Sequence, residues 1–267
     1  MNDGYNTYLA KSYRFFSFEV LFNTIKNRSL RFKRVDKFND PLDNSPYLAS
    51  NEWKHDKEQG DGSLGNFLKK VRYDKISKEL ESLYICCFCK EYKSDDSYLM
   101  WSHYGLSHSQ VCIEIDFSKY TGLSTPSEVI YPKNLVEKRN NILKHKKESI
   151  GLFVVTNKLR QWSYEKEVRL IVDIRTPNID LEKFKLCDNS YSLDADFDLE
   201  SISKVIFGIK SELSNEIETR KLFLTNGLTP KYEKMYIDPN TLKLESKPYT
   251  FDKAAPPTNW NKQCGAF

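Results

Sequence analysis

The sequence has no apolar run long enough to span a membrane. A transmembrane helix needs about 18 consecutive apolar residues, and no segment of the 267 residues approaches that length. Residues 1–10 also lack the basic and then apolar pattern of a secretory signal. We therefore expect a cytoplasmic protein with no membrane partner.

Cysteine is scarce and is not arranged for metal binding. The six cysteines do not form the two CxxC pairs of a zinc site, and they are too few for a disulfide-stabilised scaffold. Three of them lie in residues 83–89, LYICCFC, where cysteine acts as a small apolar residue of a buried strand. We expect no metal ligands among them.

An excess of one charge is also lacking. The formal net charge is only +4, which permits a nucleic-acid partner without requiring one. The basic run at residues 138–147 is the best candidate for phosphate contacts, but the flanking Glu137 and Glu148 favour a solvated helix face. Hydrophobic residues make up 39% of the chain and aromatic residues 13%, which excludes disorder throughout.

Strand and helix patterns intermix along the chain. Alternating apolar residues predict strands at 12–15, 30–34, 83–89, 111–117, 129–131, 204–208 and 231–237. Helical periodicity predicts helices at 18–26, 64–82, 98–104, 135–159 and 211–226. There is no repeat, no clear linker and no regular βαβ rhythm, so we predict a single mixed α+β domain over residues 1–247 and an irregular tail over 248–267.

Residues 162–172, WSYEKEVRLIV, are the most informative segment. As a strand, they place Glu165, Glu167 and Arg169 on one face, because successive side chains point to opposite sides. Two adjacent carboxylates can divide labour: one stays ionised beside a developing cation and the other moves a proton, as in glycosidic-bond chemistry. The alternative is a solvated strand face.

Five segments, in this order, resemble the bacterial domain-of-unknown-function family 2971. They are Tyr13-Arg14, FNDP at 38–41, the cysteine strand, MWSHY at 100–104 and the WxYExExR pattern at 162–169. The end of the strand at 204–208 also fits the family. We therefore expect the resemblance to extend from about residue 12 to residue 210.

That family is in turn similar to ADP-ribosyltransferases of the DarT type and to the mRNA-modifying toxin of toxin-antitoxin-chaperone phage-defence systems. The resemblance implies a split, twisted β-sheet core that binds NAD as a co-substrate. It implies an early-strand contact to the dinucleotide, at Arg14 or Tyr13, and a late catalytic glutamate, at Glu167. It also implies a nucleic-acid acceptor, with RNA favoured over DNA, and an antitoxin protein as a partner.

The candidate residues suit this chemistry. Loss of nicotinamide makes the ribose resemble an oxocarbenium ion, so an ionised Glu167 beside the sugar would stabilise the transition state. Glu165 would orient the acceptor or take its proton. Arg14 offers a planar fork for the pyrophosphate. Further candidate contacts to NAD are Tyr13, Asn39, Asp40, His103 and Tyr104.

Other interpretations remain open. Arg14 also suits an ion pair at a strand end, Asn39 and Asp40 suit a plain turn, and a lone His103 is more often structural than catalytic. A metal-dependent nuclease or hydrolase would combine Asp36, Asp40, Asp43, His103 and the two glutamates. A non-catalytic nucleic-acid-binding module would need only the aromatic residues and the basic run.

Overall fold

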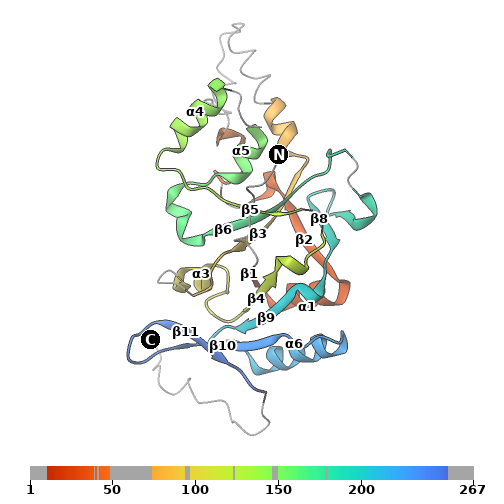
Figure 1. Cartoon of the computed structure of the whole chain (residues 1–267), viewed down its shortest axis with the longest axis vertical. Helices are drawn as coiled ribbons and strands as arrows, with labels where there is room; N and C mark the ends of the chain where they lie inside the picture. Colours follow the sequence, from red (N-terminus) through yellow and green to blue (C-terminus); the bar gives the residue numbers. More distant parts are fainter. Residues whose placement is uncertain are drawn as a thin grey trace.

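A single sheet of eleven strands organises the described part of the chain (Figure 1). The computed structural model describes residues 11–38, 40, 42–48, 74–93, 97–122, 124–145, 150–177 and 180–251. The main path of the sheet has the order β11-β10-β9-β4-β1-β3-β2-β8-β7, while β6 pairs with β3 and β5 pairs with β6. Together with the helices, this sheet makes one mixed α+β domain.

The elements have the following bounds. The strands are β1 (Lys11–Phe16), β2 (Ser29–Arg34), β3 (Leu83–Cys89), β4 (Val111–Asp116), β5 (Pro126–Glu128), β6 (Glu167–Asp173), β7 (Phe184–Cys187), β8 (Ser192–Asp196), β9 (Ile202–Phe207), β10 (Lys231–Ile237) and β11 (Leu244–Pro248). The α-helices are α1 (Phe18–Asn27), α3 (Ser97–His103), α4 (Leu135–His145), α5 (Ile150–Thr156) and α6 (Leu213–Thr225). Short 3-10 helices include η2 (Pro46–Leu48) and η5 (Arg160–Glu165).

Strand β3 is the junction of the sheet. Strand β2 pairs with the first half of β3, where Arg34 lies opposite Tyr84, whereas β1 meets the end of β3, where Tyr13 lies opposite Cys89. The whole length of β3 also pairs with β6 in an antiparallel register. Because β1 and β2 meet opposite ends of β3, the sheet diverges at this strand.

The two faces of the sheet are covered differently. Helices α1 and α6 pack on one face, over a large apolar core that includes Phe32, Phe88 and Phe207. On the other face, α5 packs over β3 and β6 through Phe153 and its neighbours, while α3 covers β4 and β9 through Trp101 (Figure 1). Two separate apolar layers therefore share this second face.

Most predicted elements are confirmed. The strands expected at 12–15, 30–34, 83–89, 111–117, 204–208 and 231–237 are β1, β2, β3, β4, β9 and β10, and the helices expected at 18–26, 98–104 and 211–226 are α1, α3 and α6. Of the helix expected at 64–82, the described residues 74–80 are helical. None of the helices within the described ranges has the length and apolarity needed to cross a membrane.

Three predictions are wrong in detail. Strand β5 lies before the expected 129–131, where Ile130 makes only an isolated bridge to Asn157. The helix expected at 135–159 appears as α4 and α5, with 146–149 outside the described residues, and it ends at Thr156. The strand expected from residue 162 begins only at Glu167, because Arg160–Glu165 form η5.

Strands β7, β8 and β11 have no counterpart among the predicted elements. The sequence of β8, SLDAD, contains small and acidic residues that strands usually disfavour; its place is decided by pairing with both β2 and β7. The expected domain boundary after residue 247 falls inside β11. Beyond that strand, Tyr249 and Phe251 pack on Phe207, with ring centroids 5.7 and 6.0 Å away, and residues 252–267 lie outside the described part.

Candidate active site

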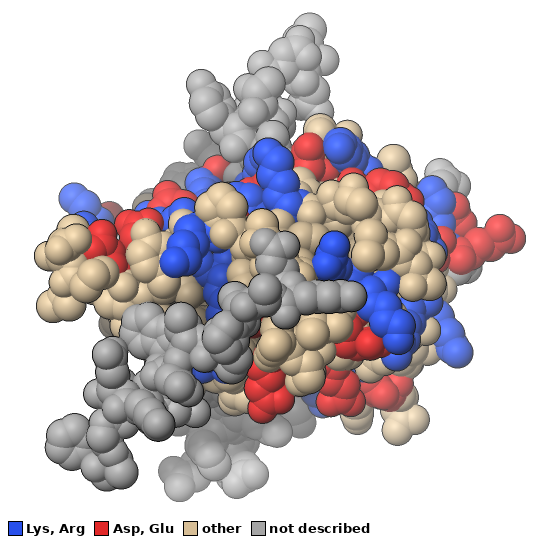
Figure 2. All heavy atoms as spheres, turned by 90° about the horizontal axis from the view of Figure 1, so that it is seen from below, with Lys and Arg blue, Asp and Glu red and all other residues tan. Residues whose placement is uncertain are grey.

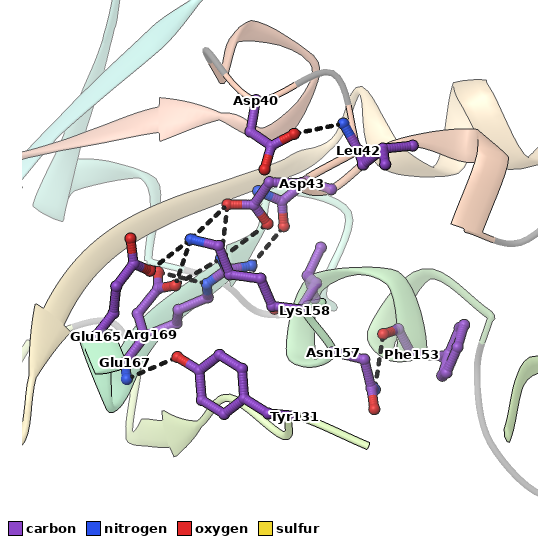
Figure 3. A network of polar contacts seen from close by, with 12 residues as sticks. Asp40, Leu42, Asp43, Tyr131, Phe153, Asn157, Lys158, Glu165, Glu167 and Arg169 are labelled. Carbon is purple, nitrogen blue, oxygen red and sulfur yellow. Dashed lines mark hydrogen bonds and ion pairs between the residues drawn. The ribbon is translucent and has the colours of Figure 1, made fainter. Parts of the chain in front are cut away.

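Five charged side chains meet between the two apolar layers of the second face. They are Asp43, Lys158, Glu165, Glu167 and Arg169 (Figure 3). All five are buried, and Arg169 is fully inaccessible to solvent. Three carboxylates face two cations, so the cluster carries one excess negative charge when all five groups are ionised. Burying such a set is costly unless each charge is paired and hydrogen-bonded.

Arg169 uses every N–H of its guanidinium. Its Nε donates to Glu167 Oε1 at 2.7 Å, and Nη2 donates to Glu167 Oε2 and to both oxygens of Asp43 at 2.9 Å. Its Nη1 donates to Asn44 Oδ1 at 2.6 Å and to the carbonyl of Val155 at 2.9 Å. This guanidinium therefore ties β6 to α5 and to the loop that carries Asp43.

Lys158 joins all three carboxylates. Its Nζ lies 2.6 Å from Glu165 Oε2, 3.2 Å from Glu167 Oε2 and 3.3 Å from Asp43 Oδ2. The backbone fixes this position, because the N–H of Lys158 donates to the carbonyl of Ile130 immediately after α5 ends. Glu165 and Glu167 thus share one cation, the Lys158 ammonium.

Glu165 reaches the cluster by a route that differs from the predicted strand. It is the last residue of η5, and Lys166 follows with a left-handed φ of 43°. This turn directs Glu165 toward Lys158 before β6 begins. Glu167 and Arg169 do share one face of β6, as expected, so the three residues converge although only two of them belong to the strand.

Tyrosine hydroxyls complete the hydrogen bonds of the two glutamates. The hydroxyl of Tyr104, which follows α3, donates to Glu165 Oε1. The hydroxyl of Tyr131 accepts from the backbone N–H of Glu167 at 3.0 Å. Tyr104 is 46% exposed, whereas Glu165 and Glu167 are 4% and 5% exposed. Tyr104 therefore links the buried acid pair to solvent.

The surroundings shift the pKa values of the two glutamates in opposite directions. Burial raises the pKa of Glu167, but Arg169 and Lys158 outweigh this effect and hold the pKa at about 2. Burial is the largest effect on Glu165 as well, and there it prevails, so the pKa of that carboxyl is raised despite Lys158 and Tyr104. Glu167 therefore stays ionised at neutral pH, while Glu165 binds a proton more readily than an ordinary glutamate.

These shifts predict a specific acid sensitivity. The folded chain binds a proton at Glu167 less readily than the unfolded chain, in which the ordinary pKa is 4.5. The stability that Glu167 contributes is therefore complete above about pH 4.5 and is lost as the pH falls to about 2. Glu165 has the opposite effect on the free energy of unfolding. Because its pKa is raised in the folded chain, its ionisation destabilises the fold at pH values above the ordinary pKa of glutamate.

Urea unfolding of the wild type and of Glu167→Gln between neutral pH and about pH 2 tests this expectation. The wild type should lose stability steeply below about pH 4.5, and the variant should show a shallower loss over the same interval. A variant that follows the wild-type pH profile would contradict the assignment. Glu91→Gln is the matched control, because Glu91 forms only an exposed pair with Lys166.

The two early-strand candidates do not join the glutamates. Tyr13 points to the same face as Glu167, but its hydroxyl donates to Glu114 at 2.8 Å and its ring packs on Tyr92. Arg14 points to the opposite face, contacts the thiol of Cys86 and lies over the ring of Phe16. The prediction that Arg14 and Glu167 line one cleft is therefore wrong, because neighbouring residues of β1 point to opposite faces of the sheet.

The turn candidates are only partly placed. Asn39 lies outside the described residues. Asp40 shapes the turn that delivers Asp43: its Oδ1 accepts from the backbone N–H of Leu42, and its carbonyl accepts from that of Asp43. In Figure 3 a hydrogen bond joins Asp40 to Leu42, whereas the contacts of the charged cluster involve Asp43. His103 lies beside Tyr104 and contacts the hydroxyl of Tyr164 at 3.3 Å.

The basic run is partly engaged within the protein. Lys138 donates to Asn157 Oδ1 at 2.7 Å, which connects α4 to the end of α5. Arg139 contacts Asn140 on the same helix. The side chains of residues 143–145 and the whole of 146–149 lie outside the described part. The described residues of α4 therefore favour the interpretation that the basic run is a solvated helix face.

Three of the five charged residues were not predicted for the NAD site. Asp43 was a candidate only for the alternative metal site, Arg169 was placed only on the same strand face as the glutamates, and neither Lys158 nor Asn44 was a candidate. The turn-forming residues around Asn44 were the available signal in the sequence, and the structure gives Asn44 a positive φ of 59°. Lys158 carries no local signal, since a lysine after an apolar helix is usually solvated.

The carboxylates do not form an open metal site. Among the described residues, no group of three or more His, Cys, Asp or Glu is arranged to hold a metal. Asp43 and the two glutamates instead surround Lys158 and Arg169, which a divalent ion would have to displace. Asp36 pairs with Arg34 at the surface. The expected nuclease set is therefore not assembled.

Comparison with known proteins gives one family. No curated protein and no solved structure matches the chain, so no named relative links it to ADP-ribosyltransferases. The family match is shorter than the expected span of about 12–210, and it leaves out Asp43 and β1. It does contain Tyr104, Lys158, Glu165 and Glu167. Residues 100–170 match the family described as "Protein of unknown function (DUF2971)".

Proposed function

We propose that this chain transfers ADP-ribose from NAD to nucleic acid, with RNA as the favoured acceptor. The observation that carries the proposal is that Glu165 and Glu167 share the Lys158 ammonium while their pKa values move apart. Pairs of carboxylates with separated pKa values are typical of enzymes that cleave glycosidic bonds. The resemblance of the sequence motifs to ADP-ribosyltransferases selects NAD as the donor.

In this mechanism the bond between ribose and nicotinamide breaks, and its electron pair moves to the nicotinamide ring. The developing positive charge on the ribose is stabilised by the excess negative charge of the cluster, in which Glu167 is held ionised. The acceptor then forms a bond to the same ribose carbon and loses a proton to Glu165. Lys158 and Arg169 position the glutamates and do not touch the reacting atoms.

Access to the pair involves Tyr104. Both glutamates are nearly inaccessible, while the Tyr104 hydroxyl bonds Glu165 and much of its ring is exposed. Substrate binding therefore requires Tyr104 to move away from Glu165. The dinucleotide also needs a cation for its pyrophosphate, and Arg14 lies on the wrong face.

The direct test uses the purified protein, NAD labelled in its adenylate half, and separate pools of RNA, DNA and protein. We expect release of nicotinamide and transfer of label to RNA. Label in the protein pool alone would reject the nucleic-acid acceptor but keep the chemistry. No nicotinamide release with any pool would reject the function. Addition of EDTA should leave the rate unchanged, because the mechanism uses no metal.

Tyr104→Phe should shift the pH dependence of the reaction. The Tyr104 hydroxyl stabilises ionised Glu165 by donating a hydrogen bond, so its loss raises the pKa of Glu165 further. If Glu165 must be ionised to accept the proton, the acidic limb of the kcat/KM profile moves to higher pH. The pH profile of label transfer to RNA measures this. A shift in the opposite direction, or none, would contradict the proton-acceptor role.

A further inference from the structure

Four aromatic rings form a continuous strip beside the acid pair. In order they belong to Tyr104, His103, Tyr164 and Trp162, and successive ring centroids lie 6.4, 6.3 and 6.0 Å apart. The first two follow one another at the end of α3, and the other two lie in η5. Because Glu165 is the next residue after Tyr164 and bonds Tyr104, the strip ends at the proposed proton acceptor.

Polar contacts hold these rings in place. The hydroxyl of Tyr164 lies 3.3 Å from Nδ1 of His103, and the Lys158 ammonium lies 5.1 Å from the centre of the Trp162 ring. His103, Tyr164 and Trp162, restrained in this way, lose little side-chain freedom when a ligand binds.

The strip is not part of the hydrophobic core. Trp101, on the same helix as His103, is completely buried and fills the core beneath α3. By contrast, Tyr104 and His103 are exposed, and Tyr164 and Trp162 are half-buried. Large aromatic side chains grouped at a surface mark binding sites more often than they stabilise a fold.

We propose that this aromatic strip binds unpaired bases of the acceptor nucleic acid; this inference rests on the proposed function and names the binding surface for its acceptor. Every base has a face that can stack on an aromatic ring, and each stacked base contributes substantially to binding. Four rings in succession suit consecutive bases of a single strand, and bases that stack at the Tyr104 end lie next to Glu165.

The charges around the strip favour the same ligand. Arg160 is exposed, stands two residues before Trp162, and makes no ion pair within the described residues, so it is open to a backbone phosphate. At the other end of the molecule, Figure 2 shows Lys and Arg interspersed with Asp and Glu over the visible described surface. That end offers no extended basic surface to compete for the strand.

The test measures binding without NAD, so its result does not depend on the proposed chemistry. Fluorescence anisotropy of a labelled single-stranded RNA of about 12 nucleotides reports the affinity, and an RNA duplex of the same length serves as the second probe. Tyr164→Ala and His103→Ala remove rings of the strip. Tyr191→Ala is the control, because Tyr191 is an exposed tyrosine, at 44%, that lies outside the strip, immediately before β8, with the ammonium of Lys37 4.2 Å from its ring centre.

We expect Tyr164→Ala and His103→Ala each to weaken binding of the single strand about tenfold, and Tyr191→Ala to leave it unchanged. The slope of log affinity against log salt concentration should stay the same in the ring variants, because no phosphate contact is removed. In Arg160→Gln this slope should become smaller by about 1, since one phosphate contact is lost. Thermal unfolding checks that the variants remain folded.

Three results would overturn the proposal: wild-type protein that does not bind the single strand, wild-type affinity in the folded ring variants, or equal affinity for single strand and duplex. If Tyr164→Ala instead loses affinity for NAD while RNA binding is intact, the strip serves the dinucleotide and the proposal is wrong. Absence of nicotinamide release would count against the proposed function alone.

Discussion

Glu165→Gln is expected to lower the rate of ADP-ribose transfer from NAD to RNA by at least about 100-fold, since general acid–base groups contribute on the order of 10²–10⁴. Glutamine keeps the shape of the side chain and can still accept the hydrogen bond from Tyr104, but it cannot take a proton. Lys158 retains Glu167 and Asp43 as partners, so the cluster remains paired. The measurement is the single-turnover rate at which label from NAD is transferred to RNA.

The fold of this variant should not suffer. The raised pKa of Glu165 means that burial disfavours its ionised form. Removing the charge should therefore increase the free energy of unfolding at neutral pH. Glu91→Gln, which breaks only an exposed ion pair, is the control and should keep the wild-type rate. A fully active Glu165→Gln enzyme would end the proposed mechanism, whatever the stability of the variant.

Arg169→Met should have the largest effect on stability. The guanidinium is completely buried and pairs with both Glu167 and Asp43, so its removal leaves two buried carboxylates without their main partner. Breaking a buried pair from one side costs about 3–5 kcal/mol. Urea unfolding followed by circular dichroism measures the loss of the free energy of unfolding.

Two further variants isolate the cause. Arg31→Met removes an arginine that forms an exposed pair with Asp194, and it should cost about 1 kcal/mol or less. The double variant Arg169→Met with Glu167→Gln should lose less than the sum of the two single changes, because it no longer leaves Glu167 as an unpaired ion. Equal losses for Arg169→Met and Arg31→Met would show that the buried network contributes nothing beyond a surface pair.

The sequence was informative about the fold wherever local pattern and tertiary context agree. Residues 83–89 are apolar throughout, and they form the central strand β3 with neighbours on both sides. The Ser17 side chain caps α1 by accepting from the backbone N–H of Val20, and Gly227 has a positive φ of 73° just after α6. The edge strands β7 and β11 were missed, because half-exposed edge strands lack a strong apolar alternation.

The sequence was less informative about the site. It identified Glu165 and Glu167 correctly as a close pair, but it placed Glu165 on a strand and joined Arg14 to them. The error over Arg14 has a simple cause. Which face of a strand a residue occupies depends on register, and a shift of one residue reverses every side chain.

By itself, the sequence determined the mixed α+β class, the order of the main strands and helices, and the motif of two acids spaced by two. These features depend on residues that are near one another in the chain, where periodicity and turn chemistry act directly. Tertiary structure alone decided that Lys158 and Arg169 bind those acids together with Asp43. Asp43 lies 126 residues before Arg169 in the chain, and a buried charge gains its stability only from groups that the folded chain brings to it.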